Sequence, residues 1–275
     1  MAVAGLWRMV SAEADRFRHA MEAEEFTLRY LPQVALARGV DPLAADPLIA
    51  VVTGVEALVR WRHPERGLLQ PDSFIPLAED TGLIRPLGQW VLRRACADAA
   101  RWSRAGLHLN LSVNLSASQI EDSLPDAVSG ILAETGLEPS RLTLELASRR
   151  LFGDSGEGNV AALLQQMVDS GVSLSADDFG TGYSSLRHLS QFPLRAVKID
   201  RSMVHSLSGI EATGATAAIQ AILQLAHSCG IEVVAEGVEK RDQRDLLFVL
   251  GCTRMQGFHF SAPIDAGSVP GLFPK

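Results

Sequence analysis

The chain has only three cysteines and no long apolar run, and these two absences exclude several classes of protein. Cys96, Cys229 and Cys252 lie in apolar stretches without paired short spacings, so neither a disulfide framework nor a zinc knuckle is predicted. All three are expected to be buried thiols. No run approaches the ~20 apolar residues that a membrane-spanning helix needs. Charged residues between Met1 and Arg18 also interrupt any signal-peptide core, so we expect a cytoplasmic protein without a membrane span.

Positive charge is also scarce. The 275 residues include 25 Lys and Arg against 32 Asp and Glu, which gives a formal net charge of -7. A surface that binds duplex nucleic acid needs clustered Lys and Arg to displace counterions from the phosphates, so no such partner is expected. A small anionic ligand is still allowed, because a few local cations or metal ions can outweigh the overall sign. Hydrophobic residues make up 47% of the chain, enough to bury a large core.

The sequence does contain a repeated unit: an apolar-periodic helix, a glycine just past its end, and a short strand that finishes in a polar residue. Residues 160–170 end at Gly171 before a strand that runs into Asp177, and residues 217–229 end at Gly230 before a strand that runs into Glu236. Glycine suits these helix exits because the left-handed conformation costs it little. Strands are predicted near residues 27–33, 50–59, 108–114, 141–146, 172–177, 195–199, 231–236 and 253–257.

Eight strands that alternate with helices predict an α/β fold, a TIM-like (β/α)8 barrel with parallel pairing through right-handed crossovers. An open doubly wound sheet would typically have fewer strands and a glycine-rich phosphate loop. The first two strands are joined through residues 37–47 without a predicted helix. We therefore expect the first strand to run antiparallel to the rest.

Polar residues stand at the ends of the predicted strands. Because the carboxyl ends of barrel strands open on one face, we expect these side chains to converge there: Glu56, Asn114, Glu145, Asp177, Asp178, Lys198, Glu236 and Gln256. Five carboxylates would repel one another unless cations were bound, and hard oxygen ligands favour Mg²⁺ or Mn²⁺. Asp177, next to Asp178, is placed to bridge two ions. The alternative for this aspartate pair is the cap of a following helix.

Short motifs follow one another in order along the chain, beginning with Glu56 to Trp61. The others are Phe74 to Glu79, Val113 to Ser116, Leu144 to Leu146, Asp177 to Leu186, Val197 to Arg201, Ala235 to Glu239 and Gln256 to Phe258. Together they resemble the EAL-domain cyclic di-GMP phosphodiesterase family over residues 20–265. A Glu-Ala-Leu match alone would carry no weight, whereas eight ordered motifs are highly specific.

The resemblance implies an enzyme that hydrolyses cyclic di-GMP, a bacterial second messenger, to linear pGpG with two Mg²⁺ or Mn²⁺ ions. It implies that Glu56, Asn114, Glu145 and Asp177 hold one ion, and that Asp177, Asp178 and Glu236 hold or orient the second. Two such ions can activate water and stabilise displacement at phosphorus. Lys198 would hold the attacking water or the developing negative charge, so Lys198, Glu236 and Glu56 are the predicted catalytic residues. Ca²⁺ is expected to inhibit, because its larger radius and looser coordination misplace the water.

The same resemblance implies substrate contacts at Leu58, Arg60, Asp200, Gln256 and Phe258, with Arg60 paired to a phosphate oxygen. Phe258 could stack on a guanine or simply pack. Glu239 is expected to order ligands and water from behind the metal ligands. It is equally typical of the charged start of an exposed helix.

A glycine- and hydroxyl-rich loop follows the aspartate pair, and the resemblance implies that it acts as a lid coupling ligand binding, metal binding and homodimer formation. The loop is Gly180, Thr181, Gly182, Tyr183, Ser184 and Ser185. Two residues depart from the family pattern. Ser148 replaces a glutamate that anchors the lid, and Leu31 replaces a common glutamine.

Three domain limits are predicted: an N-terminal helical extension at 1–18, one EAL barrel at 19–265 and a C-terminal tail at 266–275. No receiver, sensory or cyclase motif is recognisable, so the domain is expected to stand alone. The departures at Ser148 and Leu31 favour an alternative function, a receptor that binds cyclic di-GMP, hydrolyses it slowly and signals through a protein partner. A barrel hydrolase acting on another phosphate ester is a further alternative.

Overall fold

The alternation of apolar residues in the predicted strands produces the wall of a closed barrel. The structure is a computed structural model that describes residues 13–39, 46, 48–147, 157–180, 192–208 and 212–273. Within these residues the strands are β1 (Phe26–Arg38), β2 (Leu48–His63), β3 (Gly67–Leu69), β4 (Asn110–Leu115), β5 (Leu142–Ala147), β6 (Ser173–Phe179), β7 (Ala196–Ile199), β8 (Glu232–Ala235) and β9 (Arg254–Gln256).

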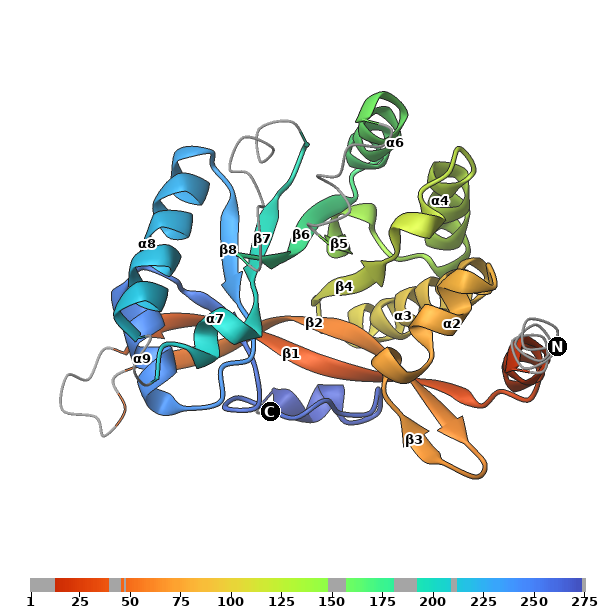
Figure 1. The fold of residues 1–275 in the computed structure, drawn as a ribbon, viewed down its shortest axis with the longest axis horizontal. Helices are drawn as coiled ribbons and strands as arrows, with labels where there is room; N and C mark the ends of the chain where they lie inside the picture. The colour runs from red at the N-terminus through yellow and green to blue at the C-terminus, as the bar shows by residue number, and fades with distance from the viewer. Residues whose placement is uncertain are drawn as a thin grey trace, which may run out of the picture.

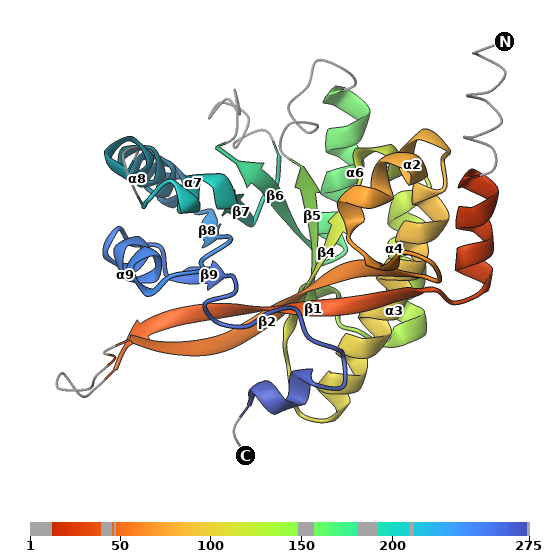
Figure 2. The same ribbon diagram turned by 60° about the horizontal axis from the view of Figure 1, so that its bottom comes forward.

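The strand order is β1-β9-β8-β7-β6-β5-β4-β2, and pairing of β1 with β2 closes the ring of eight. β3 lies outside the ring and forms a hairpin with β2. Neighbouring strands from β2 through β4 to β9 are parallel, whereas β1 is antiparallel to both β2 and β9. The TIM-like barrel and its antiparallel first strand are therefore confirmed. Figure 2 shows β1 and β2 as a long ribbon that crosses the molecule beneath the other strands.

Helices cover the outside of the barrel and connect its parallel strands (Figure 1). They are α2 (Ile75–Asp80), α3 (Ile84–Arg104), α4 (Leu124–Thr135), α6 (Glu157–Asp169), α7 (Arg201–His205), α8 (Ala212–Ser228) and α9 (Arg241–Val249), with short 3-10 turns η1 (Pro71–Ser73), η2 (Ala117–Gln119), η3 (Pro139–Arg141) and η5 (Val269–Leu272). α6 and α8 confirm the helices predicted before Gly171 and Gly230. Gly136 ends α4 in the left-handed conformation, with φ 74°, and donates its N–H to the carbonyl of Leu132.

The outward faces of the strands are apolar and pack beneath the helices. Leu111 and Val113 in β4, and Leu144 and Leu146 in β5, are all buried in one continuous hydrophobic core. Period-2 alternation turns the intervening residues to the barrel interior. Polar side chains at these inward positions therefore share one enclosed space.

A helix over residues 13–22 packs against the β1–β2 ribbon. Phe17 is fully buried against the rings of Phe26, Trp61 and Phe74, with centroids 5.1–6.3 Å apart. Arg16 pairs with Glu25, which also accepts a hydrogen bond from the Trp61 indole. The predicted domain limit at residue 18 falls inside this helix, and the predicted C-terminal tail contains η5 with a buried Val269.

The expectation of three buried thiols was wrong in one case. Cys96 and Cys252 are buried, whereas Cys229, directly after α8, is exposed. Ile222 and Ala226 of α8 are buried, whereas residues 227–230 at and beyond the end of the helix are all exposed. In the part of the chain described here, no helix combines the length and apolar character required to cross a membrane.

Candidate active site

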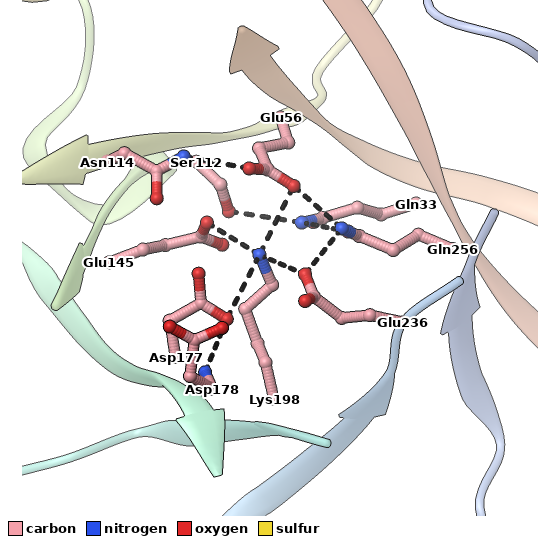
Figure 3. A network of polar contacts seen from close by, with 10 residues as sticks. All are labelled: Gln33, Glu56, Ser112, Asn114, Glu145, Asp177, Asp178, Lys198, Glu236 and Gln256. Carbon is pink, nitrogen blue, oxygen red and sulfur yellow. Dashed lines mark hydrogen bonds and ion pairs between the residues drawn. The ribbon is translucent and has the colours of Figure 1, made fainter. Parts of the chain in front are cut away.

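Side chains in or directly after the seven parallel strands β2 and β4 to β9 meet in one cluster (Figure 3). The register explains why, because parallel pairing aligns Asn114 in β4 with Glu145 in β5 and brings the ends of β6 and β7 beside them. Glu236 follows β8 directly, and Gln256 is the last residue of β9. The structure thus brings together every predicted metal ligand, together with Lys198 and Gln256.

Lys198 lies at the centre of this cluster, with 1% of its side chain exposed. Its Nζ contacts Glu236 Oε1 at 2.5 Å, Glu145 Oε2 at 2.7 Å and Glu56 Oε2 at 3.2 Å, with Asp177 Oδ1 at 4.0 Å. An ammonium group has three N–H donors, so the three nearer carboxylates satisfy it. Lys198 therefore holds acids from three different strands around one point.

Two amide side chains complete the polar shell around Glu56. Asn114 Nδ2 donates to Glu56 Oε1 at 2.8 Å, and Gln256 Nε2 donates to Glu56 Oε2 at 2.6 Å and to Glu236 Oε1 at 2.7 Å. Both Glu56 oxygens thus have partners although the residue is buried. Buried carboxylates need such partners, since desolvation is otherwise costly.

The acids of the cluster have divergent pKa values. Burial raises the pKa of Glu145 to about 8, with Glu56 and Asp177 adding to the rise and Lys198 opposing it. Burial also raises the pKa of Glu236 well above its usual range. For Glu56 the upward effect of burial is outweighed by Lys198 and by hydrogen bonds from Gln256 and Asn114, so its pKa is lowered. Burial lowers the pKa of Lys198, but the surrounding carboxylates outweigh it and hold the pKa well above its ordinary value.

The donor set fits divalent cations in its chemistry. Glu56, Glu145, Asp177 and Glu236 surround a single ammonium group, so four acids face one cation. Over the described ranges, no three or more His, Cys, Asp or Glu side chains are arranged to hold a metal ion as the cluster stands. The reason is visible in Figure 3: the carboxylate oxygens turn toward Lys198. Hard oxygen ligands with excess negative charge are what Mg²⁺ and Mn²⁺ prefer.

A register shift in β6 places the side chains of Asp177 and Asp178 at the site. The pairing of β6 with β7 shifts register between Ala176 and Phe179, and Asp178 has φ 54°, in the left-handed region. The Asp177 carboxylate accepts the N–H of Asp178 at 2.8 Å. A non-glycine residue in this conformation costs about 1–2 kcal/mol, and such strain concentrates at functional sites. The irregularity lets two consecutive carboxylates lie beside the same cavity, where simple alternation would point them to opposite faces.

A cavity of about 400 Å³ opens beside the cluster. Its wall includes Asn114, Glu145, Asp177 and Asp178 on one side and residues of α2 and α3 on the other. Leu58, a predicted substrate contact, also lines it. A volume of this order is typical of small-molecule sites, which combine apolar walls with a few polar groups.

The other predicted contact residues lie at different distances from the cluster. Arg60 is buried on the inward side of β2, and its guanidinium donates to the carbonyl of Val59. Phe258 is 65% exposed just after β9. The Asp200 carboxylate caps α7 by accepting the N–H of Ser202 at 2.9 Å. Glu239 is not joined to the cluster: it is about half exposed, and His205 Nε2 lies 3.3 Å from its Oε1.

Part of the predicted lid falls outside the described residues. Thr181, Gly182, Tyr183, Ser184 and Ser185 lie there, and so does Ser148. Gly180 is described, with φ 103°, and a Cβ at this position would lie 2.0 Å from the sulfur of Met203. A glycine is therefore required at the first position of the loop.

Two polar contributions escaped sequence reasoning. Gln33 in β1 donates Nε2 to Gln256 Oε1 at 3.0 Å, so the antiparallel strand also reaches the cluster. Ser116 donates to Glu79 Oε1 at 2.6 Å and thereby joins the end of β4 to α2 at the cavity wall. Alternation along the first predicted strand places Gln33 on one face with Leu31, and that was the available signal.

Comparisons with known proteins agree with this architecture. The EAL domain family model matches residues 14–263. An uncharacterized signaling protein of Caulobacter vibrioides is 44% identical over 258 residues, which are 92% of this chain and 29% of that protein. The bifunctional diguanylate cyclase/cyclic di-GMP phosphodiesterase MucR of Pseudomonas aeruginosa is 40% identical over 251 residues, 90% of this chain and 34% of MucR. The chain thus spans about a third of the length of these relatives.

The fold comparison gives the same family. A solved structure of the PaMucR phosphodiesterase in complex with c-di-GMP is similar, with a TM-score of 0.84 and 38% sequence identity, and the match covers 93% of this chain and 98% of that one. The family match extends over most of the 275 residues and includes every residue of the carboxylate cluster. The protein therefore belongs to the EAL domain family.

Proposed function

We propose that this chain hydrolyses cyclic di-GMP to linear pGpG with two Mg²⁺ or Mn²⁺ ions. The observation that carries the proposal is the convergence of Glu56, Glu145, Asp177 and Glu236 on Lys198, beside a cavity of about 400 Å³. Similar proteins support the substrate, since MucR is a bifunctional diguanylate cyclase/cyclic di-GMP phosphodiesterase and the PaMucR phosphodiesterase has been solved in complex with c-di-GMP.

The cluster residues divide between two ion positions in this proposal. Glu56, Asn114, Glu145 and Asp177 would hold one ion, and Asp177, Asp178 and Glu236 the other. When bound, such a pair supplies activation of water and neutralisation of charge on the phosphate. The Glu236 carboxylate, beside Gln256 and Lys198, would orient the water by accepting its hydrogen bond.

Lys198 and Arg60 supply fixed positive charge. Lys198 has no freedom to leave the cluster, because it is buried and held by three carboxylates, so its charge would stabilise the negative charge that develops on the phosphate. Arg60 would bind a phosphate oxygen, which is a better partner than the backbone carbonyl it now contacts. Leu58 and Phe258 would contact a guanine, with Asp200 and Gln256 contributing polar contacts.

Several further properties belong to the same proposal. The barrel domain would run to residue 265 and include the whole helix over residues 13–22, which packs on it. It would act in the cytoplasm and form a homodimer through its lid side, with Gly180 to Ser185 as the lid. Glu239 would order ligands and water from behind the metal ligands, although its carboxylate now contacts His205. A protein signalling partner is part of the receptor alternative below.

The decisive experiment is incubation with cyclic di-GMP and Mg²⁺ or Mn²⁺, with separation of products by chromatography. We expect pGpG from the wild type and no detectable product from Glu56→Ala, which removes a direct ligand. The exposed glutamate Glu22, on helix 13–22, gives a matched control, and Glu22→Ala should retain the wild-type rate. Hydrolysis should be inhibited when Ca²⁺ is the only divalent cation supplied. Undiminished hydrolysis in Ca²⁺, or hydrolysis by Glu56→Ala, would contradict the mechanism.

A receptor that hydrolyses slowly is the second candidate, and Leu31 favours it. Leu31 pairs with Glu56 across the β1–β2 ribbon, so an apolar side chain stands where the family has a common glutamine. Tight binding of cyclic di-GMP without product over hours would establish the receptor. Ser148→Glu tests the lid anchor, because a marked rise in rate would show that the missing glutamate limits turnover.

A further inference from the structure

The side-chain amide of Gln256 bridges the carboxylates of Glu56 and Glu236. Its amide is 2% exposed and uses both N–H groups, one to Glu56 Oε2 at 2.6 Å and one to Glu236 Oε1 at 2.7 Å. Glu56 lies in β2, which is separated from β9 by β1, and Glu236 directly follows the neighbouring strand β8. The Gln256 amide is their common hydrogen-bond donor (Figure 3).

Gln256 can donate to both carboxylates only in one of the two orientations of its side-chain amide. The two ends of a glutamine amide are nearly equal in shape, and only their partners decide the orientation. A half-turn would present the amide oxygen to Glu56 and Glu236, so both carboxylates would lose the N–H that they now accept. An interaction at the other end of the amide must therefore select the productive orientation.

Gln33 provides that interaction. Its Nε2 donates to Gln256 Oε1 at 3.0 Å and to Ser112 Oγ at 3.2 Å. Because Gln33 donates an N–H to Gln256 Oε1, the amide oxygen of Gln256 stays on the Gln33 side. The N–H groups of Gln256 are then directed at Glu56 and Glu236. The chain of contacts runs from β4 through β1 to β9 and ends on two predicted metal ligands.

Strand pairing and a glycine in the neighbouring strand leave space for the Gln33 side chain inside the barrel. Gln33 and Gln256 are direct partners in the antiparallel pairing of β1 with β9, which places their side chains on the same inward face. Opposite Gln33 in β2 lies Gly54, where a Cβ would come 3.1 Å from Gln33 Oε1 and 2.8 Å from the Asn110 carbonyl oxygen. Any larger residue at Gly54 would push against the Gln33 amide.

We propose that Gln33 is a positioning residue of the active site, which fixes the Gln256 amide and through it the carboxylates of Glu56 and Glu236. This inference rests on the proposed metal site but does not depend on the identity of the substrate. It also assigns a role to the antiparallel first strand, whose carboxyl end points away from the site. Residues that orient metal ligands from behind typically change metal affinity or activity by about 10–100-fold when replaced.

The test measures Mn²⁺ binding by electron paramagnetic resonance in the absence of any nucleotide. Gln33→Met keeps the length of the side chain and removes its N–H groups, and we expect the Mn²⁺ affinity to fall by about tenfold. Gln33→Leu also removes the N–H groups without adding a charge beside the site, and it should weaken binding as well. Gln220→Met, at an exposed glutamine of α8, is the matched control and should bind Mn²⁺ as the wild type does.

A double-mutant cycle separates positioning from a general structural effect. In a Gln256→Met background, Gln33→Met should change Mn²⁺ affinity by less than about twofold, because the group through which Gln33 acts is gone. Wild-type affinity in both Gln33 variants, or an equal loss with and without Gln256, would overturn the inference. Mn²⁺ binding with the predicted coupling but no hydrolysis of cyclic di-GMP would support Gln33 and refute the proposed substrate instead.

Discussion

The two faces of the barrel wall differ sharply, although the same strands build both. In β4, Leu111 points outward into the hydrophobic core, and its neighbour Ser112 points inward and accepts a hydrogen bond from Gln33. In β7, Val197 is buried among apolar side chains and Lys198 among carboxylates. One residue along a strand therefore separates apolar packing from a charged network.

This difference separates stability from function. The outer face gains free energy from burial of apolar area, at roughly 25 cal/mol per Å², and tolerates changes that preserve volume. The inner face buries ammonium and carboxylate groups whose desolvation offsets much of their mutual attraction. The inner network builds the site, and the outer packing holds that network in place.

The largest effect on stability is expected at the centre of the inner face. Lys198→Met leaves several buried acids without their cation, and removing one partner of a buried ion pair costs about 3–5 kcal/mol. Urea unfolding without divalent cations measures the loss, and Mg²⁺ should restore part of it by replacing the missing charge. Unchanged stability in the metal-free variant would show that the acids simply take up protons, and the contrast between the faces would then be weaker.

The outer face should respond with stability alone. Leu111→Ala creates a cavity in the packed core and is expected to cost about 3 kcal/mol in free energy of unfolding, with little change in hydrolysis per folded molecule. Its neighbour gives the matched comparison, because Ser112→Ala removes one hydrogen-bond acceptor and should cost about 1 kcal/mol. A larger loss of activity in Leu111→Ala than in Ser112→Ala would break the division between the two faces.

The pH dependence of stability should also belong to the inner face. Burial raises the pKa of Glu145 to about 8 in the folded protein from its ordinary value of 4.5, so folding favours its protonated form. The contribution of Glu145 to the free energy of unfolding is fully present below about pH 4.5 and is lost as the pH rises through about 8. In metal-free protein, Glu145→Gln should therefore flatten the fall in stability between these pH values. An identical pH profile in the variant would contradict this origin.

The smallest expected effect is a difference in reactivity among the cysteines, with no change in stability. Burial raises the pKa of the Cys96 and Cys252 thiols to about 12, so neither forms an appreciable thiolate near neutral pH. Cys229 is exposed, and iodoacetamide at pH 8 should modify it in the native protein while the two buried thiols react only after unfolding. Mass spectrometry of peptides gives the result, and rapid labelling of Cys96 or Cys252 would show that the outer core opens readily.

Much of the site could be predicted because its residues end consecutive strands. Glu56, Asn114, Glu145, Lys198 and Gln256 each follow an apolar stretch, and a closed barrel leaves only one face on which they can meet. Glu239 had the same kind of motif support, yet it lies just before α9 and its carboxylate contacts His205 at the end of α7. Four residues past the end of β8, the chain direction is no longer dictated by the sheet. Cys229 was misjudged for a related reason, because an apolar composition does not say which face of a helix end is exposed.

The sequence by itself determined the repeating order of strands and helices, the antiparallel first strand and the set of acids at the strand ends. These depend on local periodicity and on the geometry common to all barrels. Only the tertiary structure decided that Lys198 is the hub of the acids, that a register shift lets Asp177 and Asp178 face one cavity, and that Gln33 reaches Gln256 from the opposite direction. Those contacts join residues up to 223 positions apart, and their distances depend on strand register and side-chain packing, which no local pattern encodes.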